Sequence, residues 1–240
     1  MKVQSALILA LAMSGAAFAQ TKAPEPDYTV SFNAGVTTDY RYRGISQSRL
    51  QPALQGGADF AHKNGFYAGA WGSTIKWIKD TPPGDASVEI DLYGGYKGTA
   101  GDLGYDVGVL SYVYPSNKLS PSANTTELYG ALTMGPATLK YSHSVTNLFG
   151  FADSKNSGYV DLSATFDLGG GWSLTPHIGH QRVKNNGAFS YTDYSLTVSK
   201  DIDGLILSAA LVGTDTDAYL APSGKKLGRD GIVLTLKKNF

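Results

Sequence analysis

Polar and apolar residues alternate along most of this chain, in segments of about ten residues. In the clearest segment, 159–168, Val160 and Leu162 lie opposite Asp161 and Ser163. Successive side chains of a β-strand point to opposite faces, so a period of two predicts strands rather than helices. The pattern predicts twelve strands, over 28–37, 53–61, 65–73, 87–97, 103–114, 127–134, 137–145, 159–168, 172–181, 191–200, 205–213 and 231–240.

The connections between these segments alternate in length. Five are short turns, at 62–64, 98–102, 135–136, 169–171 and 201–204. Six are long and polar, at 38–52, 74–86, 115–126, 146–158, 182–190 and 214–230. Outer-membrane barrels have short periplasmic turns and longer extracellular loops, so we expect an all-β, up-and-down antiparallel transmembrane barrel of about twelve strands. A soluble secreted β-protein is the alternative fold, and its apolar face would have to point inward.

The first 27 residues differ from the rest of the chain. Lys2 precedes an apolar run from Ala6 to Met13, and the tripeptide Ala17-Phe18-Ala19 follows, which predicts a cleaved signal peptide over 1–19 rather than a buried N-terminal helix. We expect a periplasmic extension over 20–27 and a single barrel domain over 28–240. After residue 19, the longest stretch without a charged residue is 14 residues, Leu168 to Gln181, which is too short for a transmembrane helix.

Composition and charge exclude several classes of protein. The chain has 20 Lys and Arg against 20 Asp and Glu, so it lacks the basic surface that nucleic-acid binding usually requires. It has no Cys, which excludes a disulfide framework, a thiolate metal site and a cysteine nucleophile. Its hydrophobic content of 42% is too high for a disordered tail.

If the apolar faces meet lipid, the opposite faces line the lumen with more acids than bases. The expected pore-lining residues are Asp59, Glu89, Asp91, Asp106, Glu127, Lys140, Asp161, Asp167, His177 and Asp193. Rings of like charge set the selectivity of a pore, so these carboxylates favour cations. Alternatively, the carboxylates pair with Lys140, Arg41, Arg43 and hydroxyl groups and fill a narrow interior.

The long loop over 38–52 carries the charged residues Asp39, Arg41, Arg43 and Arg49. At the mouth of a pore they would gather anionic solutes. The alternative is a solvated surface or one that faces lipopolysaccharide. Aromatic residues at segment ends, such as Tyr28, Trp172 and Phe240, fit the interfacial girdles of a barrel better than a track for stacking sugars.

The sequence offers poor candidates for catalysis and predicts no catalytic residue, metal or cofactor. In Ser142-His143-Ser144 both serines lie on the face opposite His143, so this strand supplies no nucleophile and base pair. His177 and His180 fall on opposite faces of one segment, and no G-x-S-x-G or phosphate-binding glycine motif occurs. An enzyme is therefore not expected.

Two motifs resemble known families. The chain end places Phe240, Leu236, Leu234 and Ile232 on one face, which resembles the strand that the barrel-assembly machinery recognises, although Lys238 departs from that pattern. Residues 38–48, TDYRYRGISQS, together with 52–57 and 65–73, resemble the TorF family of porin-like proteins. This resemblance implies an outer-membrane barrel but no catalytic residue or settled substrate.

Together these features predict an outer-membrane channel for passive diffusion of small hydrophilic solutes, with a cation bias. Its expected partners are outer-membrane lipid and lipopolysaccharide, the assembly machinery and the solutes themselves. The alternative is a structural or adhesive barrel with a plugged lumen and functional extracellular loops.

Overall fold

The computed structural model describes residues 26–240, so the signal peptide expected over 1–19 and most of the extension over 20–27 lie outside the described residues. The strands are β1 (Tyr28–Thr37), β2 (Arg41–Tyr42), β3 (Ile45–Ser46), β4 (Ala53–His62), β5 (Phe66–Thr74), β6 (Val88–Ala100), β7 (Leu103–Val113), β8 (Thr125–Met134), β9 (Ala137–Ser144), β10 (Gly158–Ala164), β11 (Phe166–Gly169), β12 (Trp172–Arg182), β13 (Tyr191–Ile202), β14 (Leu205–Thr214) and β15 (Gly231–Asn239). Two short 3-10 helices, η1 (Trp77–Asp80) and η2 (Gly187–Phe189), lie in loops. No helix within these residues is long and apolar enough to cross a membrane.

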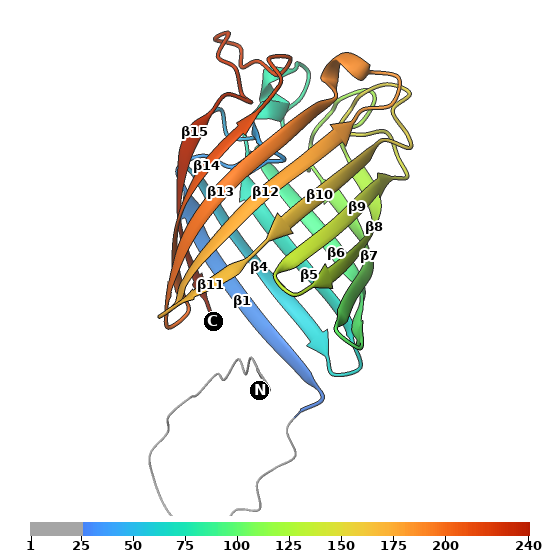
Figure 1. Ribbon diagram of the computed structural model, residues 1–240. Helices are drawn as coiled ribbons and strands as arrows, with labels where there is room; N and C mark the ends of the chain where they lie inside the picture. The colour runs from blue at the N-terminus through green and yellow to red at the C-terminus, as the bar shows by residue number, and fades with distance from the viewer. Residues whose placement is uncertain (1–25) are drawn as a thin grey trace, which may run out of the picture.

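Thirteen of these strands form one antiparallel sheet that closes on itself (Figure 1). Strand β1 pairs with β15 as well as with β4, and β10 pairs with β12 as well as with β9, so the sheet closes into a barrel. Strands β10 and β11 together make one spanning strand, which gives a barrel of twelve. The strand is interrupted at Thr165, between the end of β10 at Ala164 and the start of β11 at Phe166. The register places Pro176 of β12 opposite Ala164, and proline has no N–H to donate across the sheet there.

The twelve predicted strands are confirmed, with boundary differences of a few residues. Strand β6 continues to Ala100, so the turn expected over 98–102 shrinks to Gly101 and Asp102. Strand β8 begins at Thr125, two residues earlier than the alternation indicated. The short turns gather at one end of the barrel and the long loops at the other (Figure 1).

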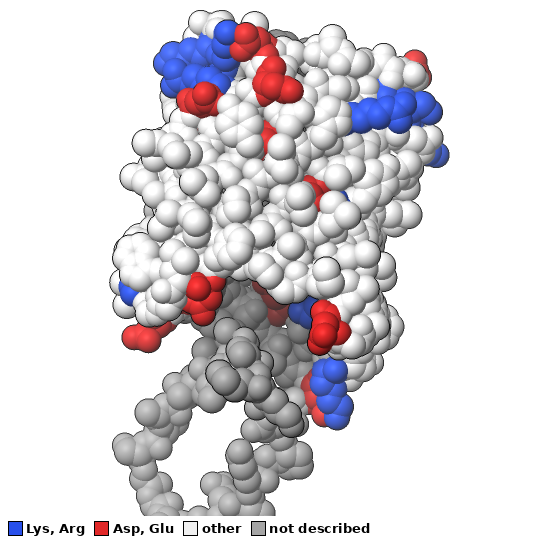
Figure 2. Space-filling model, viewed as in Figure 1, with Lys and Arg blue, Asp and Glu red and all other residues white. Residues whose placement is uncertain are grey.

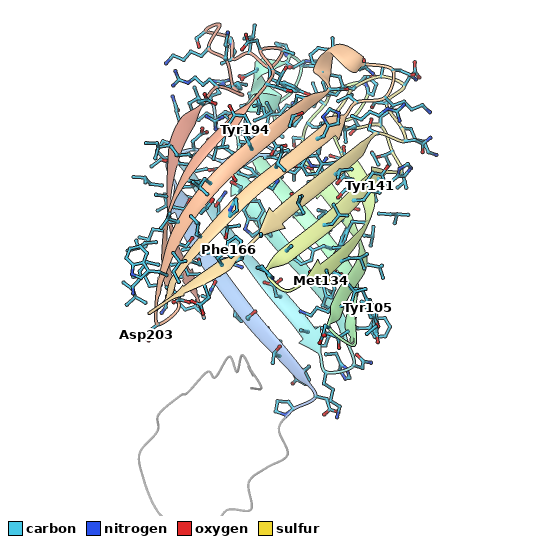
Figure 3. All side chains as sticks on the ribbon, viewed as in Figure 1. Tyr105, Met134, Tyr141, Phe166, Tyr194 and Asp203 are labelled. Atoms are coloured by element: carbon cyan, nitrogen blue, oxygen red, sulfur yellow. The ribbon has the colours of Figure 1, made fainter. Side chains whose placement is uncertain are left out.

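The apolar face of the strands points outward, as a lipid-facing wall requires. Val30, Leu92, Leu162 and Leu211 are among the exposed hydrophobic residues, and Tyr141, Phe166 and Tyr194 also lie on the outer face (Figure 3). Figure 2 shows a largely uncharged band between charged groups at the two ends. A soluble protein would bury these side chains, so the alternative of a soluble secreted β-protein does not hold.

Inward-facing tyrosines lie flat on the barrel wall because the neighbouring strand has glycine beneath each ring. Such pairs are Tyr67 with Gly95, Tyr93 with Gly69, Tyr129 with Gly108 and Tyr159 with Gly179. A Cβ at Gly108 would lie 2.5 Å from the Tyr129 Oη and 2.7 Å from the Gly94 carbonyl oxygen. These glycines therefore set how far the tyrosines reach into the lumen.

We expect Gly108→Val to destabilise the barrel by about 1–3 kcal/mol, the usual cost of overpacking. The added side chain would push against Tyr129 and the backbone of β6. Gly130→Val in β8 is the matched control, since its nearest neighbour to a new Cβ is 4.0 Å away. Urea unfolding of the refolded proteins in detergent measures the difference, and equal midpoints for both variants would contradict this packing.

Candidate functional site

The loop over residues 38–52, here called the lumen loop, turns back into the barrel instead of projecting from it. Its short hairpin, β2 and β3, extends toward strands that are far from β1. Tyr40 donates to the Glu89 carboxylate in β6, and the Tyr42 hydroxyl lies 2.8 Å from that of Tyr112 in β7. The loop therefore crosses the extracellular end of the lumen.

Arg43 at the tip of this hairpin forms an ion pair with Glu127 in β8. Its Nη2 lies 2.7 Å from Oε2 and its Nη1 lies 3.1 Å from Oε1, which is a bidentate arrangement. Its Nη1 also donates to Gln181 Oε1 in β12 at 2.5 Å. The guanidinium carbon lies 4.1 Å from the ring centroid of Tyr159 in β10. Arg43 thus joins strands from different sides of the barrel.

Burial and neighbouring charges both shift the pKa values of ionisable groups in the lumen loop. Burial alone would lower the pKa of Arg43, but the adjacent Glu127 carboxylate more than offsets this and raises the pKa above its ordinary value. Burial, assisted by Glu89, raises the pKa of Tyr40 well above its ordinary value. Arg43 therefore stays charged and Tyr40 stays protonated as a donor to Glu89.

A second set of contacts fixes the lumen loop from within. Asp39 accepts from Arg41 Nε at 2.5 Å and from Ser46 Oγ at 2.5 Å. Arg41 also donates to the Leu227 carbonyl oxygen at 2.9 Å, which ties the lumen loop to the loop before β15. Gly44 has a φ of +77°, and a Cβ there would lie 2.8 Å from the Cβ of Asp193, so glycine fits where the loop meets the wall.

These contacts change the interpretation of the mouth residues. The side chains of Arg41 and Arg43 are each only 7% exposed, and Asp39 is buried with them. Arg49 forms an ion pair with Asp80 of η1. The structure therefore brings the four residues into internal pairs, where Arg41 and Arg43 are not free to gather anionic solutes, because the loop folds inward.

Below the lumen loop, acidic groups are hydrogen-bonded to tyrosines two strands away in the sheet. Tyr93 donates to Asp59 at 2.5 Å, and Tyr67 donates to Asp106 at 2.5 Å and also contacts the Tyr129 hydroxyl. The Lys140 ammonium lies 4.1 Å from the ring centroid of Tyr129. This layer combines ionisable groups with hydroxyls that point into the barrel.

A separate cluster surrounds His177 in β12. Its Nε2 lies 2.7 Å from Asp161 Oδ2, and its Nδ1 lies 3.6 Å from Asp193 Oδ2. Tyr159 donates to Asp193 Oδ1 at 2.9 Å. The side chains of Asp161 and His177 keep 23% and 17% of their surface accessible, so water reaches this part of the lumen.

The remaining expected pore-lining residues lie at the two ends. Glu89, Asp91 and Glu127 are buried beside the lumen loop at the extracellular end. Asp167 is exposed at the opposite end, where its Oδ1 accepts from the Gly169 N–H at 2.8 Å. The ten residues are thus spread along the barrel and do not form one ring.

Sequence reasoning missed the tyrosines that bind these carboxylates. Tyr93 follows Asp91 by two positions, Tyr129 follows Glu127 by two, and Tyr159 precedes Asp161 by two. The period of two places each tyrosine on the same face as its neighbouring acid, so this signal was present in the sequence.

The serines and histidines considered for catalysis remain separated. His143 bonds to Tyr141 and Asn156 on the outer face, whereas Ser142 and Ser144 are buried on the other face. Among residues 26–240 there is no group of three or more His, Asp or Glu side chains with metal-binding geometry.

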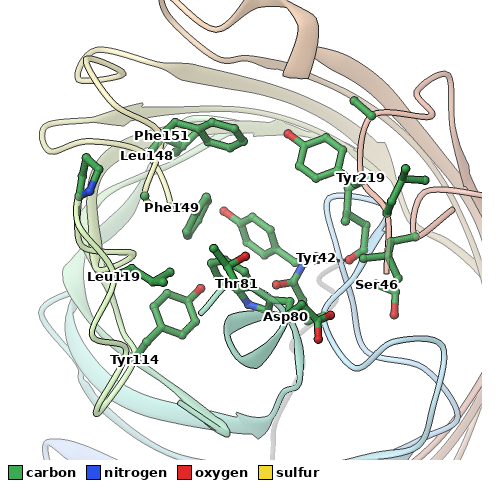
Figure 4. A pocket seen from close by; sticks show the side chains of 18 of the residues that line it. Tyr42, Ser46, Asp80, Thr81, Tyr114, Leu119, Leu148, Phe149, Phe151 and Tyr219 are labelled. Carbon is green, nitrogen blue, oxygen red and sulfur yellow. Dashed lines mark hydrogen bonds between the residues drawn. The ribbon is translucent and has the colours of Figure 1, made fainter. Parts of the chain in front are cut away.

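Above the lumen loop, the extracellular loops enclose a cavity of about 420 Å³ (Figure 4). Tyr42, Ile45, Ser46 and Gln47 of the lumen loop form part of its lining. Other lining residues are Trp77, Asp80, Tyr114, Leu119, Leu148, Phe149, Phe151, Gln181, Tyr191 and Tyr219. We call this cavity the vestibule.

A family model described as a bacterial protein of unknown function, Gcw_chp, matches residues 21–240. The chain belongs to the Gcw_chp family. No curated protein matches the chain.

Solved structures with a similar fold include two outer-membrane porins. The KdgM porin, solved in complex with disordered oligogalacturonate, is 6% identical with a TM-score of 0.56, and the match covers 88% of this chain and 97% of that one. The NanC porin is 10% identical with a TM-score of 0.57, covering 88% of this chain and 99% of that one. At these identities the likeness shows that this Gcw_chp protein has the fold of an outer-membrane porin.

We expect Arg43→Met to destabilise the protein by about 3–5 kcal/mol, because it leaves Glu127 buried without its cation. The double variant Arg43→Met/Glu127→Gln should recover most of this loss, since it removes both charges. Thermal unfolding of the single and double variants in detergent measures the coupling. Lys63→Met, which removes an exposed pair with Asp27, is the control and should have little effect. Additive losses in the double variant would show that Arg43 and Glu127 are not coupled.

Proposed function

We propose that this Gcw_chp protein is an outer-membrane channel through which small hydrophilic solutes diffuse passively. The observation that carries this proposal is the closed barrel whose inward face holds ionisable and hydroxyl groups that stay partly accessible below the lumen loop. A barrel of twelve strands encloses more space than an eight-stranded barrel, whose interior is filled by side chains. It encloses less space than a 16-stranded porin, which keeps an aqueous channel. The lumen loop narrows this passage further, so only small solutes would pass.

The charges of the lumen support a preference for cations. Below the lumen loop, Asp59, Asp106 and Asp161 face inward and Asp167 lies at the end of the barrel, whereas the nearby basic groups are Lys97, Lys140 and His177. A carboxylate-rich passage attracts cations and repels anions. The oligogalacturonate of the KdgM complex is a polyanion, so we infer that the solutes of this chain differ from it and are cationic or neutral.

The lumen loop itself favours a second candidate, a plugged barrel whose extracellular loops do the work. Asp39, Ser46 and Ser48 are buried, and the Arg43 pair joins the loop to the opposite wall. A loop held in this way keeps the lumen closed unless the pair opens. The two candidates differ in whether the folded barrel conducts.

The location and biogenesis of the protein are part of the proposal. The expected signal peptide and the resemblance to the TorF family support export to the outer membrane, where lipid and lipopolysaccharide would surround the barrel. Phe240, the proposed signal for the assembly machinery, exchanges two backbone hydrogen bonds with Phe32, at 2.9 and 3.2 Å. The end of the chain therefore lies at the seam where the barrel closes.

We expect the refolded protein to show discrete conductance steps in planar bilayers, with a reversal potential in a salt gradient that indicates cation preference. Asp106→Asn/Asp161→Asn should lower this preference, by roughly fivefold for each carboxylate if each contributes about 1 kcal/mol. Asp102→Asn in the exposed turn after β6 is the control. Preference for anions, or no change in the double variant, would contradict the proposed selectivity.

Replacing residues 39–50 by a short Gly-Ser linker should raise the conductance severalfold, because the lumen loop fills the passage. Thr37 pairs with Ala53, so a short turn can join β1 to β4. Replacing the exposed residues 222–225 in the same way is the control. A silent native barrel that conducts only after loop replacement would support the plugged candidate, and silence of both folded proteins would exclude a channel.

A further inference from the structure

The lumen wall carries charges of both signs along one row that runs across the strands. In the register of the sheet, Lys97 in β6 lies opposite Asp106 in β7, and Lys140 in β9 lies opposite Asp161 in β10. Ala131 of β8 joins these two pairs, because it lies opposite both Asp106 and Lys140. Residues in such a row follow one another at intervals of about 4.8 Å, the distance between neighbouring strands. The row therefore presents two adjacent pairs of opposite charge to the passage below the lumen loop.

Tyrosine rings hold the lysines of this row away from its acids. The Lys140 ammonium lies 4.1 Å from the ring centroid of Tyr129, and the Lys97 ammonium lies 5.7 Å from that of Tyr67. Both rings rest on glycines of the neighbouring strand, which fixes their place on the wall. Neither lysine forms an ion pair with a carboxylate among residues 26–240. The ammonium groups therefore keep N–H donors for a solute.

The acids of the row also keep free oxygen atoms. Tyr67 donates to Asp106 Oδ1 at 2.5 Å, and His177 Nε2 lies 2.7 Å from Asp161 Oδ2. Asp106 Oδ2 and Asp161 Oδ1 have no hydrogen-bond partner in the described part of the chain, and neither atom is buried. The Asp161 side chain keeps 23% of its surface accessible, and Lys97 is exposed. Solutes can therefore reach the row from the end of the barrel opposite the lumen loop.

An ammonium beside a carboxylate selects a solute that carries both charges. The carboxylate of such a solute accepts from Lys140, and its ammonium donates to Asp161, which gives two charge-assisted hydrogen bonds. In an α-amino acid the ammonium is on the carbon next to the carboxylate, so one molecule can bond to both side chains on adjacent strands. An ion of one sign would bond to one side chain and be repelled by the other.

We propose that Lys140 and Asp161 form a binding site for a zwitterionic α-amino acid within the passage. Lys97 and Asp106 repeat the arrangement nearer the end with the short turns. This inference rests on the proposed function, because it names the class of solute for the same passage. A zwitterion has no net charge, so it is one of the neutral solutes that a carboxylate-rich lumen admits.

The test is calorimetric titration of the full refolded barrel in detergent at neutral pH. The probes are alanine and two analogues that each keep one charge, alaninamide with the ammonium and lactate with the carboxylate. We expect saturable binding of alanine, about tenfold or more tighter than that of either analogue, because each analogue loses one charge-assisted bond. No binding of alanine, or binding no tighter than that of an analogue, would overturn the proposal.

Two variants test which side chain binds which group. Lys140→Met should weaken alanine binding about tenfold and leave alaninamide binding unchanged, whereas Asp161→Asn should weaken alanine binding as much and leave lactate binding unchanged. Lys237→Met is the matched control, since Lys237 of β15 lies opposite the uncharged residues Gly35 and Ile206. Alanine binding that Lys140→Met and Asp161→Asn leave intact would overturn the site.

Heat-modifiable migration on a gel first confirms that each variant is a folded barrel. If a variant does not fold, the comparison of alanine with its analogues on the native protein still decides the proposal. Conductance separates this inference from the proposed function. A silent barrel that binds alanine as expected would contradict the channel but not the site. A conducting barrel that binds alanine no tighter than its analogues would contradict the site but not the channel.

Discussion

Closure of the sheet is the constraint on which the rest of this structure depends. Within a bilayer, every backbone N–H and C=O must find a partner inside the protein, and an open sheet edge cannot meet this requirement. The β1 to β15 pairing meets it by joining the first and last strands of the meander, and the β10 to β12 pairing continues the sheet between successive spanning strands. Closure also separates the two faces of each strand, because one face then meets lipid and the other faces a lumen.

The size of the lumen is a second constraint, because a barrel of twelve strands encloses more space than short side chains can fill. The lumen loop fills part of that space, and its charged residues then have to be neutralised away from bulk water. Arg43 is paired with Glu127, and Arg41 is paired with Asp39. The same loop that narrows the passage therefore depends on acids that would otherwise line an open pore, such as Glu127.

The inward fold of this loop also shapes the outer end of the barrel. Tyr42 and Gln47 become part of the vestibule lining, and aromatic residues from the other extracellular loops complete its walls. The barrel is thus divided into an aromatic chamber outside the loop and a carboxylate-rich passage below it. The two parts therefore differ in chemistry.

The sequence by itself determined the strands, their faces and the order of turns and loops. These follow from a period of two and from Gly, Pro and Asn at turns, which are local properties of the chain. The continuous alternation over 159–168, for example, predicted a spanning strand, and β10 and β11 occupy that segment with one break at Thr165.

Only the tertiary structure decided where the lumen loop lies. Arg43 contacts Glu127 and Gln181, which are 84 and 138 residues away along the chain. A loop exposed at the mouth of the barrel and a loop buried inside the lumen would show the same local pattern of charged and aromatic residues. The difference arises from partners on distant strands, which the closed barrel brings within bonding distance of residues 39–49. The vestibule arises in the same way, since its walls come from loops that only the closed barrel brings together.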